Sequence, residues 1–142
     1  MKIGIINNGI NNIGSVVGSL NNLGIEYYII ENYQDFSEAD KLILPGIGNF
    51  KKSKEILDKK KFTEQIKNKV LIEKIPILGI CLGMQLLAKK GSEGSTRGFS
   101  EGLNLIEGTV ENLKKLGSKL ILPHIGWNNI NKKSNPSIIS SI

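Results

Sequence analysis

The chain has 142 residues and a formal net charge of +6, with one cysteine and one histidine among them. This length suits a single domain, over residues 1–142, that buries its own core. One cysteine excludes an internal disulfide, and no Cys/His cluster has the spacing of a metal site. No run approaches the roughly 20 apolar residues that span a bilayer, and the N-terminus lacks the pattern of a signal peptide. We therefore expect a cytoplasmic protein with no membrane contact, metal or cofactor.

The positive charge does not indicate a nucleic-acid partner. Arg97 is the only arginine among the 19 basic residues, and the lysines are scattered along the chain. Aromatic residues do not alternate with them, as they would on a surface that stacks bases. The lysines are therefore interpreted as a solvated surface.

The first 80 residues alternate between strand and helix patterns. A compact apolar run predicts a strand over residues 3–6, and apolar residues at helical spacing predict a helix over 13–23 that Gly24 ends. Strands are predicted over 26–30, 41–44 and 75–80, with one or two amphipathic helices within 51–71. This alternation predicts a doubly wound α/β fold with a mainly parallel sheet.

The pattern changes after the strand over 75–80. A helix is predicted over 84–90, followed by a loop of turn-forming residues from 91 to 98. Short strands separated by glycines are predicted over 103–106, 109–110 and 120–122. No element is predicted over 131–142.

Cys81 lies at the centre of the sequence Gly79-Ile80-Cys81-Leu82-Gly83, between a predicted strand and a predicted helix. A strand, a nucleophile between glycines and a helix form the sharp turn called a nucleophile elbow. The strained backbone of this turn needs small neighbours, and the start of a helix favours a thiolate. A lone cysteine can also be a small buried hydrophobe. The flanking glycines favour the nucleophile.

A second glycine-rich turn, Pro45-Gly46-Ile47-Gly48, also follows a predicted strand. Because the carboxyl ends of parallel strands meet at one edge of a sheet, this turn and the elbow are expected to form one site. The alternative is that these glycines only close the turn at the end of their strand.

Three segments carry a resemblance to a known family. They are Gly-Ile-Cys-Leu-Gly-Met-Gln over 79–85, Leu-Pro-Gly-Ile-Gly over 44–48 and Leu-Pro-His-Ile-Gly-Trp-Asn over 122–128. They resemble the class I glutamine amidotransferases, whose parallel sheet is of flavodoxin-like type. More narrowly, they are similar to the glutaminase subunits of imidazole glycerol phosphate synthases. The resemblance runs from Met1 to about Asn129.

The resemblance implies a role for each matched residue. Cys81 would attack the side-chain amide of glutamine, and backbone N–H groups would hold the oxyanion. Glu93 would hold the substrate's amino group, although an exposed glutamate in a glycine-rich loop can also be merely solvated. Trp127 would face a partner subunit, or it could be part of the core. The full set is Cys81 as nucleophile, Leu82, Gly46, Ile47 and Gly48 at the oxyanion hole, Gln85 and Glu93 at the substrate, and His124, Gly126 and Trp127 at the partner interface.

Two features depart from the family pattern. The loop after the first strand reads Asn7-Asn8-Gly9-Ile10-Asn11-Asn12, where the family tends to have Asp-Tyr-Gly-x-Gly-Asn. Asn11 is expected to take the positive φ of the replaced glycine at modest cost. The family's catalytic His-Pro-Glu segment has no counterpart within these 142 residues, and His124 belongs to the partner-facing segment. We therefore expect a domain without its last strands, and a polypeptide that by itself hydrolyses glutamine negligibly.

Three functions remain open from the sequence. The first is a glutaminase that passes ammonia to a (β/α)8-barrel cyclase in a heterodimer of histidine biosynthesis, with glutamine as the small-molecule substrate. The second is a paralogous amidotransferase subunit for surface sugars, which the insertion over 94–98 suggests. The third is a catalytically dead remnant that only binds a partner.

Overall fold

The computed structural model describes residues 1–96, 98–123 and 125–129. The chain divides into two units, residues 1–112 and residues 113–142. All the helices and strands of the described residues lie in the first unit. No helix among the described residues is long and apolar enough to cross a membrane.

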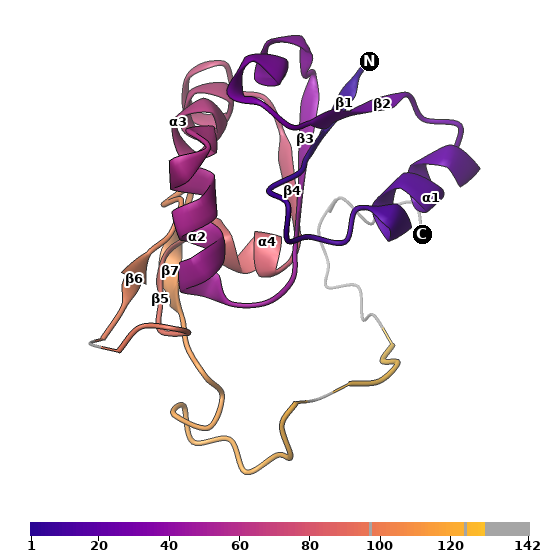
Figure 1. The fold of residues 1–142 in the computed structure, drawn as a ribbon. Helices are drawn as coiled ribbons and strands as arrows, with labels where there is room; N and C mark the ends of the chain where they lie inside the picture. Colours follow the sequence, from indigo (N-terminus) through magenta and orange to yellow (C-terminus); the bar gives the residue numbers. More distant parts are fainter. Residues whose placement is uncertain (97, 124, 130–142) are drawn as a thin grey trace. The chain divides into compact units, whose positions relative to one another are not determined.

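The first unit is built on a parallel four-stranded sheet in the order β2-β1-β3-β4 (Figure 1). Its strands are β1 (Ile3–Ile6), β2 (Tyr27–Ile30), β3 (Lys41–Gly46) and β4 (Ile77–Cys81). Each neighbouring pair is parallel. The predicted α/β fold with a mainly parallel sheet is therefore confirmed.

Helices lie on both faces of this sheet, as Figure 1 shows. On one face, α1 (Gly14–Asn22) packs Leu20 against Ile3, Ile5 and Ile43. The other face carries α2 (Phe50–Lys59), α3 (Phe62–Lys67) and α4 (Leu82–Leu86). Successive strand residues point to opposite faces, so Leu42 and Leu44 pack into the second core while Ile43 packs into the first.

The predicted helical stretch over 51–71 forms α2, α3 and a π-helical turn, η2 (Asn68–Ile72). Lys54 and Thr63 both hydrogen-bond Asp58 Oδ1, at 2.6 Å each, and so connect the two α-helices. Burial by itself raises the pKa of Asp58, but these hydrogen bonds outweigh it and hold the pKa below its ordinary value. A 3-10 turn, η1 (Tyr33–Glu38), connects β2 to β3.

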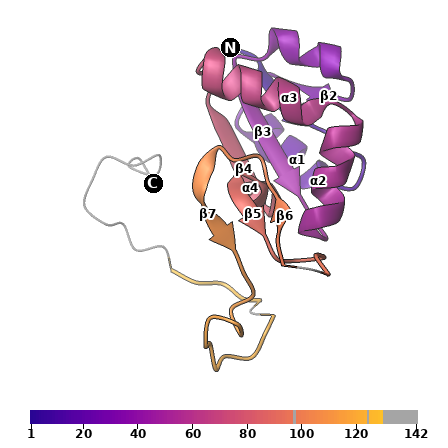
Figure 2. The same ribbon diagram turned by 90° about the vertical axis from the view of Figure 1, so that its left-hand side faces the viewer.

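The helix that the sequence predicts after Cys81 is shorter in the structure. The predicted helix over 84–90 already ends at Leu86, and residues 88–91 form β5 (Ala88–Gly91). This strand is the middle of a small sheet, with β6 (Ser100–Glu101) on one side and β7 (Ile106–Val110) on the other (Figure 2). Leu86 and Leu87 are both buried, but the chain turns there from α4 into the middle strand of the small sheet.

The predicted short strands are also placed differently. Residues 103–105 are not a strand, and β7 runs through Gly108 instead of stopping there. In the second unit, the strand predicted over 120–122 is absent, and Leu120 and Ile121 are exposed. Without a neighbouring strand to pair with, a short apolar run does not form one.

Candidate active site

Cys81 is the last residue of β4 and immediately precedes α4. Its backbone angles, φ 55° and ψ −118°, lie outside the regions that L-residues ordinarily occupy. Such strain persists only where the surrounding structure imposes it. Its side chain is exposed as a free thiol. The structure thus bears out a strand-to-helix elbow and rules out the alternative of a buried hydrophobic cysteine.

Three glycines, Gly46, Gly79 and Gly83, let β3, β4 and α4 pack closely at the elbow. A Cβ on Gly79 would lie 2.5 Å from Met84 Cα in α4, and one on Gly83 would lie 1.8 Å from the carbonyl oxygen of Leu44 in β3. A Cβ on Gly46 would lie 2.5 Å from the backbone nitrogen of Gly83. All three contacts involve main-chain atoms, so larger residues could be accommodated only by moving the backbone. The glycines of the sequence G-x-C-x-G therefore have a packing reason here.

The second glycine-rich turn lies directly beside the elbow. In the pairing of β3 with β4, Gly46 is opposite Cys81. Ile47 is exposed, and Gly48 has a φ of +91°, which favours glycine. The predicted juxtaposition of the two turns at one sheet edge is therefore present. It brings Gly46 next to both Cys81 and Leu82.

Glu93 is attached to the same edge through the start of α2. Its Oε2 accepts a hydrogen bond from the backbone N–H of Phe50 at 3.0 Å, and its carbonyl oxygen accepts one from Lys51 at 3.4 Å. Asn49 Oδ1 accepts a third from the N–H of Lys52 at 3.1 Å. These three bonds satisfy N–H groups that the start of a helix leaves unpaired. The Glu93 loop is thus joined to the residues that follow Gly48.

Comparisons with known proteins identify the family of the chain. The family model for glutamine amidotransferase class-I matches residues 4–137. The chain belongs to this family. A crystal structure of glutamine amidotransferase superposes with a TM-score of 0.63 at 22% identity, covering 77% of this chain and 55% of that chain. The fold of this amidotransferase is therefore the family's.

Curated relatives are named as imidazole glycerol phosphate synthase subunits. HisH 1 of Campylobacter jejuni subsp. jejuni serotype O:23/36 (strain 81-176) is 42% identical over 128 residues, covering 90% of this chain and 62% of the relative. HisH of Bacillus subtilis (strain 168) is 38% identical over 131 residues, covering 90% and 60%. HisH of a Prochlorococcus marinus strain is 39% identical over 132 residues, covering 93% and 59%. The amidotransferase chain thus spans about 60% of the length of these relatives.

The remaining predicted site residues are less closely joined to the elbow. Gln85 is half-buried in α4, one turn after Cys81. Gly126 and Trp127 belong to the second unit, where the Trp127 side chain is fully exposed. His124 lies outside the described residues.

The loop after β1 is hydrogen-bonded to the end of β3, a contact that the sequence analysis did not predict. Asn11 does not have a positive φ, contrary to expectation. Instead its Nδ2 donates to the carbonyl oxygen of Ile6 at 2.7 Å and to that of Pro45 at 3.5 Å. Pro45 precedes the glycine-rich turn, so the Asn11 amide connects the ends of β1 and β3. Asparagine is a known turn former, and its place in the loop that follows β1 was the available signal.

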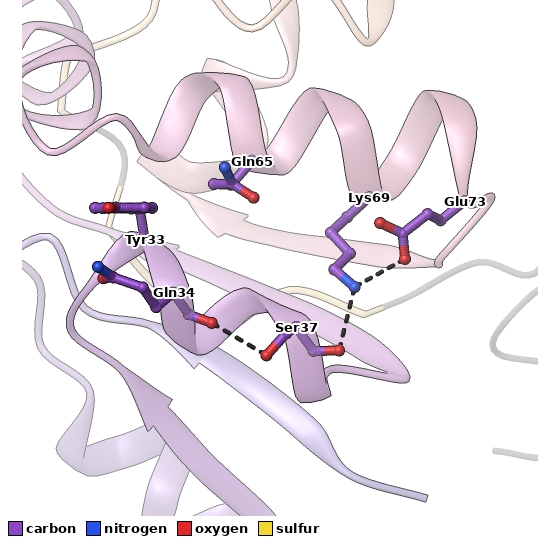
Figure 3. A pocket seen from close by; sticks show the side chains of 6 residues that line it. All are labelled: Tyr33, Gln34, Ser37, Gln65, Lys69 and Glu73. Carbon is purple, nitrogen blue, oxygen red and sulfur yellow. Dashed lines mark hydrogen bonds and ion pairs between the residues drawn. The ribbon is translucent and has the colours of Figure 1, made fainter.

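A hollow elsewhere in the first unit has none of the predicted site residues in its lining. It measures about 440 Å³ and is lined by residues of η1, α3 and η2, as Figure 3 shows: Tyr33, Gln34, Ser37, Gln65, Lys69 and Glu73. The buried Lys69 ammonium donates to Glu73 Oε2 at 2.8 Å and to the carbonyl oxygen of Ser37 at 3.3 Å. Its charge is therefore balanced within the protein. Because its lining includes neither Cys81 nor a residue of either glycine-rich turn, this hollow is not the candidate active site.

The described residues contain no cluster of three or more histidine, cysteine, aspartate or glutamate side chains that could hold a metal ion. The arrangement at the elbow offers an exposed thiol, backbone N–H groups from two turns and a carboxylate on the adjoining loop. Such a set suits covalent attack on a carbonyl or amide carbon by sulfur.

Proposed function

We propose that this chain is the glutaminase subunit of an imidazole glycerol phosphate synthase, in which Cys81 hydrolyses glutamine to glutamate and ammonia. The observation that carries the proposal is the strained Cys81 backbone between β4 and α4, with Gly46 opposite it in the sheet. The names of relatives that are 37–42% identical support the choice within the family. They do not favour the alternative of surface-sugar amidation.

In the proposed reaction, the Cys81 sulfur attacks the carboxamide carbon of glutamine, and the carbonyl electrons move onto oxygen. The backbone N–H of Leu82 and one from residues 46–48 would stabilise this oxyanion. When the oxyanion collapses, the C–N bond breaks and the amide nitrogen leaves as ammonia, taking up the proton that the Cys81 thiol has lost, so a thioester remains. Water then hydrolyses the thioester to glutamate and restores the thiol.

Substrate would be held by the residues around the elbow. Glu93 uses Oε2 to accept from Phe50, so its other carboxylate oxygen is available to the ammonium group of glutamine. Gln85 would contact the substrate from α4. Because Glu93 is bound to the helix that follows the glycine-rich turn, substrate recognition and the oxyanion hole would be set by one rigid unit.

The proposal also concerns the catalytic base and the protein that receives the ammonia. The family's base is a histidine that the resemblance does not match to any position of this sequence, so we propose that residues 1–142 by themselves do not turn over glutamine. The proposed partner is a (β/α)8-barrel cyclase in a heterodimer, contacted by His124, Gly126 and Trp127. A cytoplasmic location suits a nucleophilic thiol, since reducing compartments keep it free.

Covalent labelling tests the nucleophile without requiring turnover. A glutamine analogue with a diazoketone in place of the amide is expected to modify Cys81, detected as a mass increase on the peptide that contains it. Excess glutamine should slow this labelling, whereas it should not slow alkylation by iodoacetamide to the same extent. The exposed Ile72, replaced by alanine, provides a control variant with unchanged labelling. Labelling of Cys81 that glutamine fails to slow would refute a glutamine site at the elbow.

A further inference from the structure

The hollow between η1 and the helical segment of α3 and η2, called here the η1–η2 hollow, has a polar lining. Figure 3 shows the side chains of η1 on one side of it and those of α3 and η2 on the other. Its volume of about 440 Å³ is typical of small-molecule sites. Each of the six lining residues has a side chain that can form hydrogen bonds: Tyr33, Gln34, Ser37, Gln65, Lys69 and Glu73.

Lys69 is the buried cation of this lining, with a side chain that is only 8% exposed. An ammonium group has three N–H donors. One is bonded to Glu73 Oε2 at 2.8 Å, and a second lies 3.3 Å from the carbonyl oxygen of Ser37, which is slightly longer than usual. The third has no acceptor among the residues that the structure describes. Because buried charged donors are normally hydrogen-bonded, Lys69 has a donor left for a ligand in the hollow.

The charges around the hollow favour a neutral ligand. Glu73 accepts one hydrogen bond on each carboxylate oxygen, from Asn68 Nδ2 at 2.9 Å and from Lys69. An anion bonded to Lys69 would lie beside this carboxylate and be repelled by it. A cation would be repelled by Lys69 and by Lys61, whose Nζ lies 5.8 Å from the centre of the Tyr33 ring.

Two glutamine amides line the hollow from different elements. Gln34 belongs to η1 and Gln65 to α3, and neither side-chain amide is hydrogen-bonded to another described residue. Each amide can both donate and accept. Ser37 Oγ donates to the carbonyl oxygen of Gln34 at 3.1 Å, so only its lone pairs remain available. The lining therefore offers unused donors and unused acceptors together, and hydroxyl groups can pair with both kinds.

We propose that the η1–η2 hollow binds a neutral polyol through two hydroxyl groups on adjacent carbon atoms. One hydroxyl oxygen accepts the third N–H of Lys69, and the neighbouring hydroxyl donates to a remaining lone pair of Glu73. Further hydroxyl groups pair with the amides of Gln34 and Gln65. The C–H groups of the polyol pack on the ring of Tyr33, which is 44% exposed.

Other ligand classes satisfy the lining less well. A carboxylate ion accepts hydrogen bonds without donating any, so the amide oxygens of Gln34 and Gln65 would stay unpaired while Glu73 repels the ion. An apolar aromatic ligand would cover Tyr33 but leave the third N–H of Lys69 without an acceptor. Only a neutral ligand with several hydroxyl groups matches both the charges and the hydrogen-bonding groups of the hollow.

The experiment is an NMR titration of the nitrogen-15-labelled chain with myo-inositol, D-sorbitol and D-ribose, each in turn. For at least one polyol, the side-chain NH2 signals of Gln34 and Gln65 are expected to shift with saturation and a Kd on the order of 1 mM, as the usual affinity per atom gives for a ligand of about 12 non-hydrogen atoms. Sodium acetate and tetramethylammonium chloride are the ionic probes and should give no saturable shift. Absence of a saturable shift with all three polyols up to about 100 mM, or tighter binding of an ionic probe, would overturn the proposal.

Substitutions assign the binding to the η1–η2 hollow. Gln65→Leu keeps the size of the side chain and removes its hydrogen bonds, so it should raise the Kd about tenfold, with the Gln34 signal as the readout. Tyr33→Leu should raise the Kd about threefold through loss of the ring. Asn22→Leu makes the same polar-to-apolar change at an exposed position of α1, on the other face of the sheet, and should leave the Kd within about twofold. Circular dichroism verifies the fold of each variant. A folded Gln65→Leu variant that binds as tightly as Asn22→Leu would contradict the proposal.

The polyol site is separate from the proposed reaction, because its lining includes neither Cys81 nor Glu93. Cys81→Ala should therefore bind the polyol with an unchanged Kd. Polyol binding together with labelling of Cys81 that glutamine fails to slow would refute the glutamine site and keep the polyol site. Labelling that glutamine slows, without polyol binding, would do the reverse.

Discussion

Replacing Gly83 with alanine tests whether the elbow depends on close backbone packing between α4 and β3. A Cβ at this position would lie 1.8 Å from the carbonyl oxygen of Leu44, and real Cβ atoms essentially never approach other atoms within 3.0 Å. α4 and β3 must therefore separate by at least about 1.2 Å. A backbone oxygen within a paired strand cannot turn aside as a flexible side chain can, so the main chain has to move.

The expected cost follows from this displacement. Overpacking of an interior typically costs about 1–3 kcal/mol, and more when the backbone must shift. We expect Gly83→Ala to lower the free energy of unfolding by about 3 kcal/mol, at the upper end of that range. Because α4 begins directly after Cys81, the thiol also moves relative to residues 46–48. A misplacement of about 1 Å lowers reactivity toward a bound substrate by about 100-fold.

Urea unfolding followed by circular dichroism measures the loss of stability, and the rate of labelling by the glutamine analogue measures the loss of reactivity. Gly18→Ala is the matched control, since Gly18 lies within α1 and an added Cβ there meets no atom within 4 Å. That variant should gain up to about 1 kcal/mol, because alanine favours the helix. Unfolding midpoints that agree between Gly83→Ala and the unchanged protein would refute the packing argument.

Three further predictions concern other residues. Glu93→Ala should lower the free energy of unfolding by about 1 kcal/mol, because the hydrogen bond to the Phe50 N–H is lost. Glu93→Gln keeps an acceptor and should lower it by only a few tenths of about 1 kcal/mol. Both variants should weaken the protection of Cys81 by glutamine, and equal stability of the two would contradict the capping role. Because the pKa of Asp58 is lowered in the folded state, the contribution of Asp58 to stability is present above pH ~4 and is lost as the pH falls. Urea midpoints measured between pH 6 and pH 3 should therefore fall more steeply for the unchanged protein than for Asp58→Asn. Parallel curves would show that the ion pair of Asp58 with Lys54 is not stabilising. The 142-residue polypeptide assayed for glutamate release should match the Cys81→Ala background, and a turnover that Cys81→Ala abolishes would show that a base is present after all.

Sequence patterns predicted the elements of the parallel sheet well because those patterns are local. The strands before Cys81 are short apolar runs followed by turn formers, and α1 has one apolar face and ends next to Gly24. Past the elbow, local patterns failed. The run over 84–90 was predicted as a helix, but Ala88 begins the strand β5 because β6 and β7 pair with that strand on both sides. Those partners follow it by more than ten residues, so no window around residue 88 contains them.

The features of the candidate site also separate into those that the sequence predicted and those that only the structure revealed. The sequence by itself predicted that Cys81 sits in a strained turn between a strand and a helix, because the glycines on each side of it leave room for close backbone packing. It also determined that the turn over 45–48 ends at the same sheet edge. Only the tertiary structure decided that Gly46 lies opposite Cys81, that Glu93 caps α2 and that Asn11 connects β1 to β3. These contacts join residues 34 to 43 positions apart along the chain. Strand register and helix packing set such distances, and no local spacing in the sequence encodes them.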